Sequence, residues 1–163
     1  MKRFAAAVMM VLGFASTTSS LTWAGEEEDI AKGVAAAESW LAIVDAGKYG
    51  DSWERAASTM QKGITKPAWE KAVSGVRDQV GAVKSRILMK GDSAPKLAKL
   101  AVGDAIVIQF TTAFEKLAPT IETVTPFREQ DGTWKVSGYY VKPAPTPPPT
   151  PAVNPTAKQD ANS

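Results

Sequence analysis

Six side chains could supply acid–base or binding chemistry to this chain, because they carry carboxyl, phenol, amide or guanidinium groups. They are Asp45, Tyr49, Arg86, Gln109, Glu122 and Tyr139. A carboxylate in an apolar site, helped by a tyrosine, can move a proton on a small apolar substrate. Asp51 is a further carboxylate that could serve in this way. No motif selects any of them, so the sequence predicts no catalytic residue.

Histidine and cysteine are both absent from the 163 residues, which excludes several classes of site. Without cysteine there are no disulfides, thiolate nucleophiles or cysteine metal ligands. Without histidine, a Ser-His-Asp triad and a typical zinc site cannot form. The glycines match neither a P-loop nor the G-x-G-x-x-G pattern of dinucleotide sites. The sequence therefore predicts neither a cofactor nor a metal site, and it favours a protein that is not an enzyme.

Asp45 lies near the expected C-terminus of the first helix, where a negative charge is electrostatically unfavourable. Such a carboxylate needs compensation, which Arg77, Arg86 or a loop amide could supply. A buried ion pair is one interpretation, and a catalytic base is the other. We favour the ion pair, because shifted acids also arise in ordinary ion-pair networks.

Arg86, Gln109, Glu122 and Tyr139 lie within or beside expected strands. If they share one face of the sheet, they could form a binding surface there. Strand parity alone does not place all four on one face, since the register between strands cannot be derived from the sequence. A solvated face is the favoured interpretation, because antiparallel sheets commonly leave one side in water.

Four tryptophans fall within the expected helices and strands. They are Trp40, Trp53, Trp69 and Trp134. They could line a ligand pocket, or they could fill the space between helices and a bent sheet. We favour the second interpretation, because buried aromatic rings dominate small cores.

A first helix is predicted by apolar residues at helical spacing, from the acidic run Glu26–Asp29 to a stop at Gly47. The stripe consists of Ile30, Val34, Ala37, Leu41 and Val44. A second, short helix is expected from Gly50 or Asp51 to about Met60. A third begins near Pro67, which suits a first helical turn, and ends at Gly81. Its apolar stripe is Trp69, Val73, Val76 and Val80.

After Gly81 the pattern changes from helix to strand. Strands are predicted over Lys84–Lys90, Ile106–Phe114, Ile121–Arg128 and Thr133–Val141, whereas Lys96–Val102 is ambiguous between loop and strand. Pro126 predicts an edge or a bulge, and Asp131-Gly132 predicts a tight hairpin. Helices followed by antiparallel strands indicate the α+β class. We expect three N-terminal helices packed on a curved four-stranded antiparallel sheet, in a cystatin-like or nuclear-transport-factor-two-like arrangement.

The two ends of the chain do not fit this domain, which we place at residues 26–142. Residues 1–24 resemble a signal peptide, with Lys2 and Arg3 before a short apolar run and small residues before a cut at Gly25. Cleavage removes both basic residues from a chain of net charge +2, leaving it near neutral. We therefore expect export to the periplasm, no membrane insertion after cleavage and no binding to nucleic acid. Residues 143–163 are rich in proline and are expected to be a disordered tail.

A set of motifs in order along the domain resembles one family. They are WLAIVDAGKYGDSW (Trp40–Trp53), TKPAW (Thr65–Trp69), VR (Val76–Arg77), GAVKSR (Gly81–Arg86), IQFTTAF (Ile108–Phe114), ETV (Glu122–Val124) and DGTWKVSGYY (Asp131–Tyr140). With them the chain is similar to the exported bacterial domain-of-unknown-function family 4019. Pro126 departs from its pattern, where an aliphatic residue is expected. The resemblance implies an exported α+β domain and no particular reaction.

Two functions remain open from the sequence. The first is a non-catalytic periplasmic module that binds a protein or a small ligand, and that could form a homodimer through the exposed face of its sheet. The second is a carboxylate/tyrosine enzyme, such as an isomerase acting on an apolar substrate in a cone-shaped pocket. The second rests on analogy with steroid isomerases at the level of the fold, and fold does not determine function. We favour the first, because the commonest general base is absent.

Overall fold

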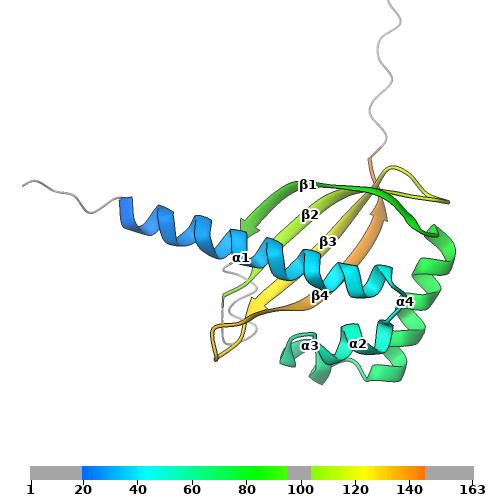
Figure 1. Cartoon of the computed structure of the whole chain (residues 1–163), viewed down its shortest axis with the longest axis horizontal. Coiled ribbons are helices and arrows are strands. Elements are labelled where there is room, and N and C mark those ends of the chain that lie inside the picture. Colours follow the sequence, from blue (N-terminus) through cyan, green and yellow to red (C-terminus); the bar gives the residue numbers. More distant parts are fainter. Residues whose placement is uncertain (1–19, 95–103, 146–163) are drawn as a thin grey trace, which may run out of the picture.

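The computed structural model describes residues 20–94 and 104–145, with side chains from Gly25 onward. The helices are α1 (Ser20–Asp45), α2 (Tyr49–Glu54), α3 (Ser58–Gly63) and α4 (Lys66–Val80). The strands are β1 (Val83–Ser93), β2 (Ile106–Phe114), β3 (Thr120–Arg128) and β4 (Trp134–Pro143). The α+β class and the four antiparallel strands are confirmed (Figure 1). The described part of the chain has four helices, not three.

Helix α1 begins at Ser20, six residues before the predicted start at Glu26. The intervening residues contain no proline, and leucine, tryptophan and alanine all tolerate a helix, so the helix extends through them. The other end is as predicted. Gly47 has φ of 72°, and its amide donates to the carbonyl of Val44.

The predicted second helix is two short helices, α2 and α3. The interruption lies at Ala57, whose extended backbone (φ −62°, ψ 150°) leaves the helical region. Its amide donates to the carbonyl of Val136 on β4 at 2.8 Å. This bond to the sheet takes the amide away from the helix, so a separate helix starts at Ser58.

Helix α4 starts with Pro67 in its first turn and stops at Gly81, which has φ of 77°. The predicted stripe is wrong at one position. Val76 is 37% exposed, whereas Arg77 is buried at 8%. Arg77 lies four residues after Val73 on the same side of the helix, so it faces the interior in place of Val76.

The sheet is a meander of neighbouring strands in the order β1-β2-β3-β4. Strand β2 alternates as predicted, with Ile106, Ile108 and Phe110 turned toward the helices. The register shifts between Thr125 and Pro126, which is the predicted bulge. Strand β1 is longer than predicted and contains two register shifts of its own, at Lys84 and Met89.

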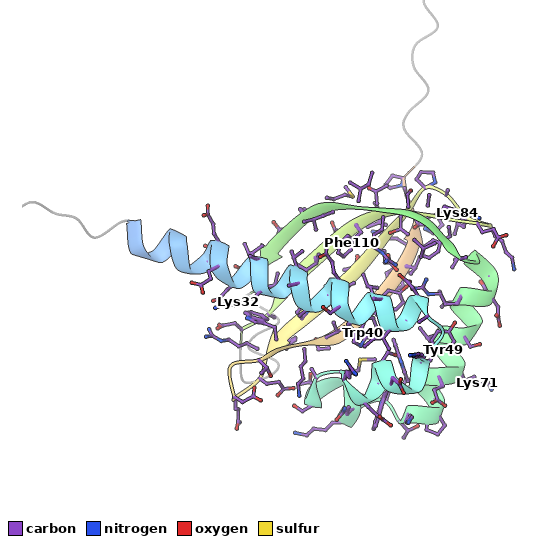
Figure 2. The ribbon with its side chains drawn as sticks, viewed as in Figure 1. Lys32, Trp40, Tyr49, Lys71, Lys84 and Phe110 are labelled. Atoms are coloured by element: carbon purple, nitrogen blue, oxygen red, sulfur yellow. The ribbon has the colours of Figure 1, made fainter. Side chains whose placement is uncertain are left out.

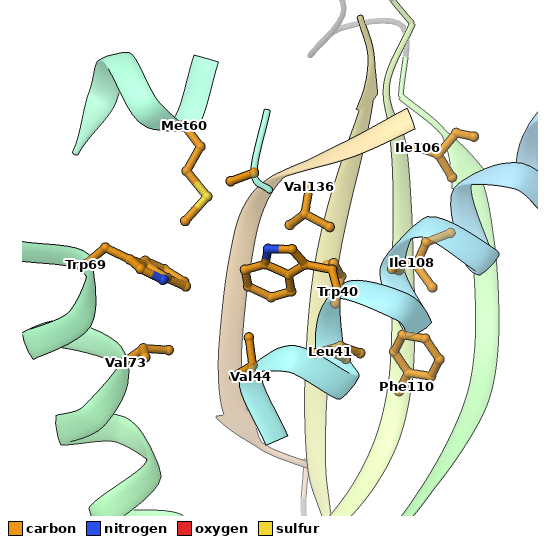
Figure 3. Packing of buried hydrophobic residues seen from close by; sticks show 13 residues of the cluster. Trp40, Leu41, Val44, Met60, Trp69, Val73, Ile106, Ile108, Phe110 and Val136 are labelled. Atoms are coloured by element: carbon orange, nitrogen blue, oxygen red, sulfur yellow. The ribbon is translucent and has the colours of Figure 1, made fainter. Parts of the chain in front are cut away.

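The main core lies between the helices and one face of the sheet, hereafter the inner face (Figure 3). Helix α1 crosses this face and contacts all four strands (Figure 1). Leu41 of α1 and Phe110 of β2 are almost completely buried there. Gly33 lets α1 approach β2, because a Cβ at this position would meet Ile106 at 2.9 Å.

Some predictions fall outside the described residues. They concern the signal peptide up to residue 19, the segment Lys96–Val102 and the tail from residue 146. Within the described residues, Pro143 belongs to β4 rather than to the tail. None of the described helices is both long enough and apolar enough to cross a bilayer.

Candidate functional site

Glu122 is a completely buried carboxylate on the inner face of the sheet. The alternation of β3 turns it inward together with its neighbours Thr120 and Val124. Its Oε2 accepts hydrogen bonds from Arg86 Nε at 2.6 Å and from Thr112 Oγ1 at 2.8 Å. Its Oε1 accepts from the Tyr139 hydroxyl at 2.7 Å and from Arg86 Nη2 at 3.2 Å. Both oxygens are therefore saturated, as a buried charge requires.

Arg86 of β1 joins Glu122 to Asp45 at the end of α1. Its Nη1 donates to Asp45 Oδ2 at 2.6 Å, and its Nη2 donates to Oδ1 at 3.1 Å. Burial on its own lowers the pKa of Arg86, but the hydrogen bonds to the two carboxylates outweigh it and raise the pKa above the ordinary value. Arg86 thus remains a cation shared by two anions.

Arg77 of α4 approaches the same acids from the helical layer. Its Nη2 lies 2.9 Å from Asp45 Oδ1 and 3.6 Å from Glu122 Oε1. The same nitrogen donates to the Tyr139 hydroxyl at 3.0 Å. The guanidinium carbon lies 5.3 Å from the ring centroid of Phe114, within the range of a cation–π contact. Nε of Arg77 is buried and has no hydrogen-bond partner.

Tyr139 of β4 links these charges to the aromatic core. Burial, followed by the nearby negative charge of Glu122, raises the pKa of its phenol well above the ordinary value. The ring lies 5.5 Å from that of Trp40 in an edge-on arrangement. The phenol therefore stays protonated and acts as a hydrogen-bond donor to Glu122.

We call these residues the polar clamp: Asp45, Arg77, Arg86, Thr112, Glu122 and Tyr139. Each of the four strands supplies one of them, and α1 and α4 supply the other two. Two carboxylates and two guanidinium groups make the formal charge zero. No described cluster of three or more acidic residues is arranged to hold a metal ion. The arrangement is an ion-pair network, in which arginine contacts each of the two carboxylates.

Beside the clamp lies an open pocket of about 640 Å³, which we call the corner pocket. It is lined by Asp45, Tyr49, Arg77, Asp78, Glu115 and Lys116, among others. Asp45 faces it with 27% of its side chain exposed while both arginines bind its carboxylate. Tyr49 sits where α2 begins, beside the end of α1 (Figure 2). The sequence-predicted Asp51 is exposed on α2 and contributes nothing to the clamp.

The four tryptophans belong to the core or pack against it, and Trp40 and Trp134 also line a small open pocket of about 170 Å³. Trp40 and Trp69 are buried, with ring centroids 5.7 Å apart (Figure 3). Their indole nitrogens both donate to Ser52, to its carbonyl and its hydroxyl respectively. Trp53 and Trp134 are partly buried and pack against the same cluster.

Gln109 does not join the other candidate residues. It alternates with Ile108 and Phe110, so it points away from the helices, on what we call the outer face. There it lies in one cross-strand row with Lys90, Thr123 and Tyr140. The structure thus brings together Asp45, Arg86, Glu122 and Tyr139, places Tyr49 beside them, and separates Gln109 from them.

Two members of the clamp were not among the predicted site residues. The sequence indicates Arg77 only as one possible partner for Asp45, and the apolar stripe predicts Val76 for the interior instead. Thr112 could have been predicted as a buried polar residue, since it lies in the inward-facing row of β2. Ser52, which is fully buried and binds two indoles, could not be predicted in this way.

Comparison with known proteins identifies the domain but no activity. No curated protein and no solved structure matches the chain. A family described as "Protein of unknown function (DUF4019)" matches residues 36–139, a span that includes every member of the polar clamp. The chain therefore belongs to the DUF4019 family.

Proposed function

We propose that this chain is an exported, non-catalytic binding module whose outer sheet face binds a protein. One observation carries the proposal: the outward residues of the two central strands include no charged side chain. They are Val107, Gln109, Thr111 and Ala113 of β2, with Ile121, Thr123 and Thr125 of β3. Charged residues are depleted from the centre of protein interfaces, so this composition suits a binding surface.

The edges of the outer face support the same proposal. Ile87 of β1 is 66% exposed, and Tyr140 of β4 is 63% exposed. Tyrosine and apolar side chains are typical interface anchors. Among the described strand residues of this face, the charged ones lie on the edge strands β1 and β4, such as Lys90, Asp92 and Lys142. An uncharged centre with a charged rim is the usual anatomy of a binding surface.

The polar clamp supports a non-catalytic role. A general base needs a carboxylate that can take up a proton from the substrate. Glu122 is enclosed by four hydrogen bonds, and Asp45 is held by two arginines. The isomerase alternative requires one of these acids in an apolar cavity. The pocket beside Asp45 is instead open and lined with charges, so we place this alternative second.

The proposal also includes export of the chain and the fold type of its domain. We propose that the chain is cut before Gly25 and acts in the periplasm, which the pattern of residues 1–24 supports. We also propose a cystatin-like or nuclear-transport-factor-two-like arrangement, supported by helices on one side of a four-stranded meander. The intact mass of the periplasmic protein tests the first point: a chain that retains residues 1–24 contradicts it.

A photo-crosslinking amino acid at Thr123 tests the binding function in the native envelope. Thr123 points outward from a central strand, so we expect a protein adduct at this position. The matched control carries the same amino acid at Val76, which is exposed on α4 away from the sheet. Adduct formation at Thr123 should disappear when Ile87→Lys is introduced on the same face. Equal adducts at Thr123 and Val76, or none at Thr123, contradict the proposal.

A further inference from the structure

We infer that the partner of the outer face is a second copy of this chain, packed sheet against sheet. The inference rests on the proposed binding role of that face and names its partner. A two-fold interface presents the same surface from both subunits, so the surface must be compatible with itself. A centre without charge meets this requirement, because no like charges are brought together there.

The strand register defines which residues would meet. One cross-strand row contains Lys90, Gln109, Thr123 and Tyr140, and the next contains Ile87, Thr111, Ile121 and Lys142. A two-fold axis parallel to the strands places β1 over β4 of the second copy and β2 over its β3. Within the first row, Lys90 then faces Tyr140 of the second copy, and Gln109 faces its Thr123.

A two-fold axis could also run across the strands, and electrostatics distinguishes the two axes. An axis across the strands and centred on the first row would place Lys90 opposite Lys90 of the second copy. The parallel axis instead places the Lys90 ammonium against an exposed aromatic ring, a favourable cation–π pairing. We therefore assign the axis parallel to the strands.

The size of the face predicts a weak dimer. Four strands about 4.8 Å apart and nine residues rising about 3.4 Å each give a footprint of roughly 600 Å² per copy. Both copies together bury about 1,200 Å², the lower limit for a specific complex. We expect a reversible dimer with a dissociation constant on the order of 10 µM.

Sedimentation velocity of the exported chain, over about 1 µM to about 500 µM, measures this association directly. We expect the mass to rise from monomer to dimer across the range. Thr123→Lys places a charge in the uncharged centre and should weaken the dimer at least about 10-fold. Ile87→Lys is a second variant, on a 66% exposed position that faces Lys142 of the second copy, so it brings two like charges together where folding is not at stake. Val76→Lys is the matched control and should dimerise like the unmodified chain.

Mixing two single variants tests the axis. Gln109→Lys and Thr123→Asp should each weaken self-association, whereas an equimolar mixture should form a heterodimer. With the axis parallel to the strands, the new lysine of one chain faces the new aspartate of the other. A mixture that stays monomeric contradicts the assigned axis, and circular dichroism verifies that both variants are folded.

The outcomes separate this inference from the proposed function. A chain that stays monomeric up to about 500 µM overturns the dimer. If the Thr123 crosslinker still captures a different protein, the binding role stands without the dimer; if it captures nothing, both fall. A dimer that survives Thr123→Lys and Ile87→Lys uses another surface and also overturns the inference. If the chain dimerises only after residues 146–163 are deleted, the chain's own tail occupies the outer face in the intact protein. That result also overturns the inference.

Discussion

The inner face of the sheet is stabilised differently at its two ends. At one end, Ile106 and Ile108 of β2 pack against the apolar stripe of α1. At the other end, the same face carries the polar clamp. Thr112 and Glu122 belong to it and occupy inward-facing positions of their strands, where an apolar residue is usual. Both ends are buried, yet only at the second end does stability require that every buried donor and acceptor has a hydrogen-bond partner.

The physical difference lies in directionality. Apolar burial is roughly proportional to area and has little angular preference, so side chains of similar volume can replace one another. A buried ion pair loses hydration on both partners and recovers it only when every donor and acceptor is satisfied. Conservative changes should therefore be tolerated at the apolar end and costly at the clamp.

The largest expected effect comes from Glu122→Gln, which keeps the shape of the side chain and removes its charge. Arg77 and Arg86 then share a single carboxylate, and the free energy of unfolding should fall by about 3–5 kcal/mol. Urea unfolding measures it. Glu38→Gln, on an exposed position of α1, is the control and should leave the unfolding midpoint unchanged. An equal, small change in both variants would show that the clamp does not stabilise the fold.

The next effect is non-additivity within the clamp. Arg86→Met and Glu122→Leu should each destabilise strongly, because each leaves a charge without its partner. The double variant should lose less than the sum by about 1–3 kcal/mol, since neither charge is then left alone. Additive losses in this double-mutant cycle would mean that the short contact between the two residues contributes no coupling energy.

A smaller effect is expected at alkaline pH from Tyr139. Its pKa is raised in the folded chain, so its stabilising contribution is complete below about pH 10, the pKa of an unfolded tyrosine. Above that pH the unfolded chain releases the proton and the folded chain retains it. Stability should fall as pH rises, by up to about 1.4 kcal/mol per pH unit from this group. Unfolding midpoints between pH 9 and pH 12, about the range of phenol ionisation, measure the slope.

Tyr139→Phe should lower stability at neutral pH and make the alkaline fall shallower. Tyr140→Phe, on an exposed phenol of the same strand, is the matched control and should retain the slope of the unmodified chain. A Tyr139→Phe variant with an unchanged slope would contradict the protonated, buried phenol that the clamp requires.

The smallest effect is expected at the apolar end. Ile108→Leu conserves volume in a fully buried position and should cost less than about 1.5 kcal/mol. Thermal unfolding of this variant beside Glu122→Gln compares the two ends directly. A loss at Ile108 as large as that at Glu122 would remove the distinction between them.

Local patterns in the sequence were sufficient for most of the elements. The spacing of Ala37, Leu41 and Val44, and the glycine stop at Gly47, depend only on helix geometry. The alternation of β2 and the hairpin at Asp131-Gly132 likewise depend on neighbouring residues. Helix boundaries were less accurate where the deciding contact was distant, as at Ala57, whose amide binds β4.

The candidate site was only partly accessible from the sequence. Asp45 could be recognised as a carboxylate in need of a cation, because the end of a helix is a poor place for an anion. Its partners could not be chosen, since Arg77 and Arg86 lie on different elements. Nothing in the sequence separates Gln109 from Glu122. The pairing of Phe110 with Glu122 places Glu122 on the inner face and Gln109 on the outer face.

By itself, the sequence determined the α+β class, the apolar stripe of α1 and the absence of histidine and cysteine chemistry, because each follows from residue types and short-range spacing. Only the tertiary structure decided that Arg77 rather than Val76 enters the interior, and that six residues from six elements close into one neutral clamp. The reason is register: pairing between strands and the rotation of a helix over a sheet are fixed by contacts between distant residues, which no local period encodes.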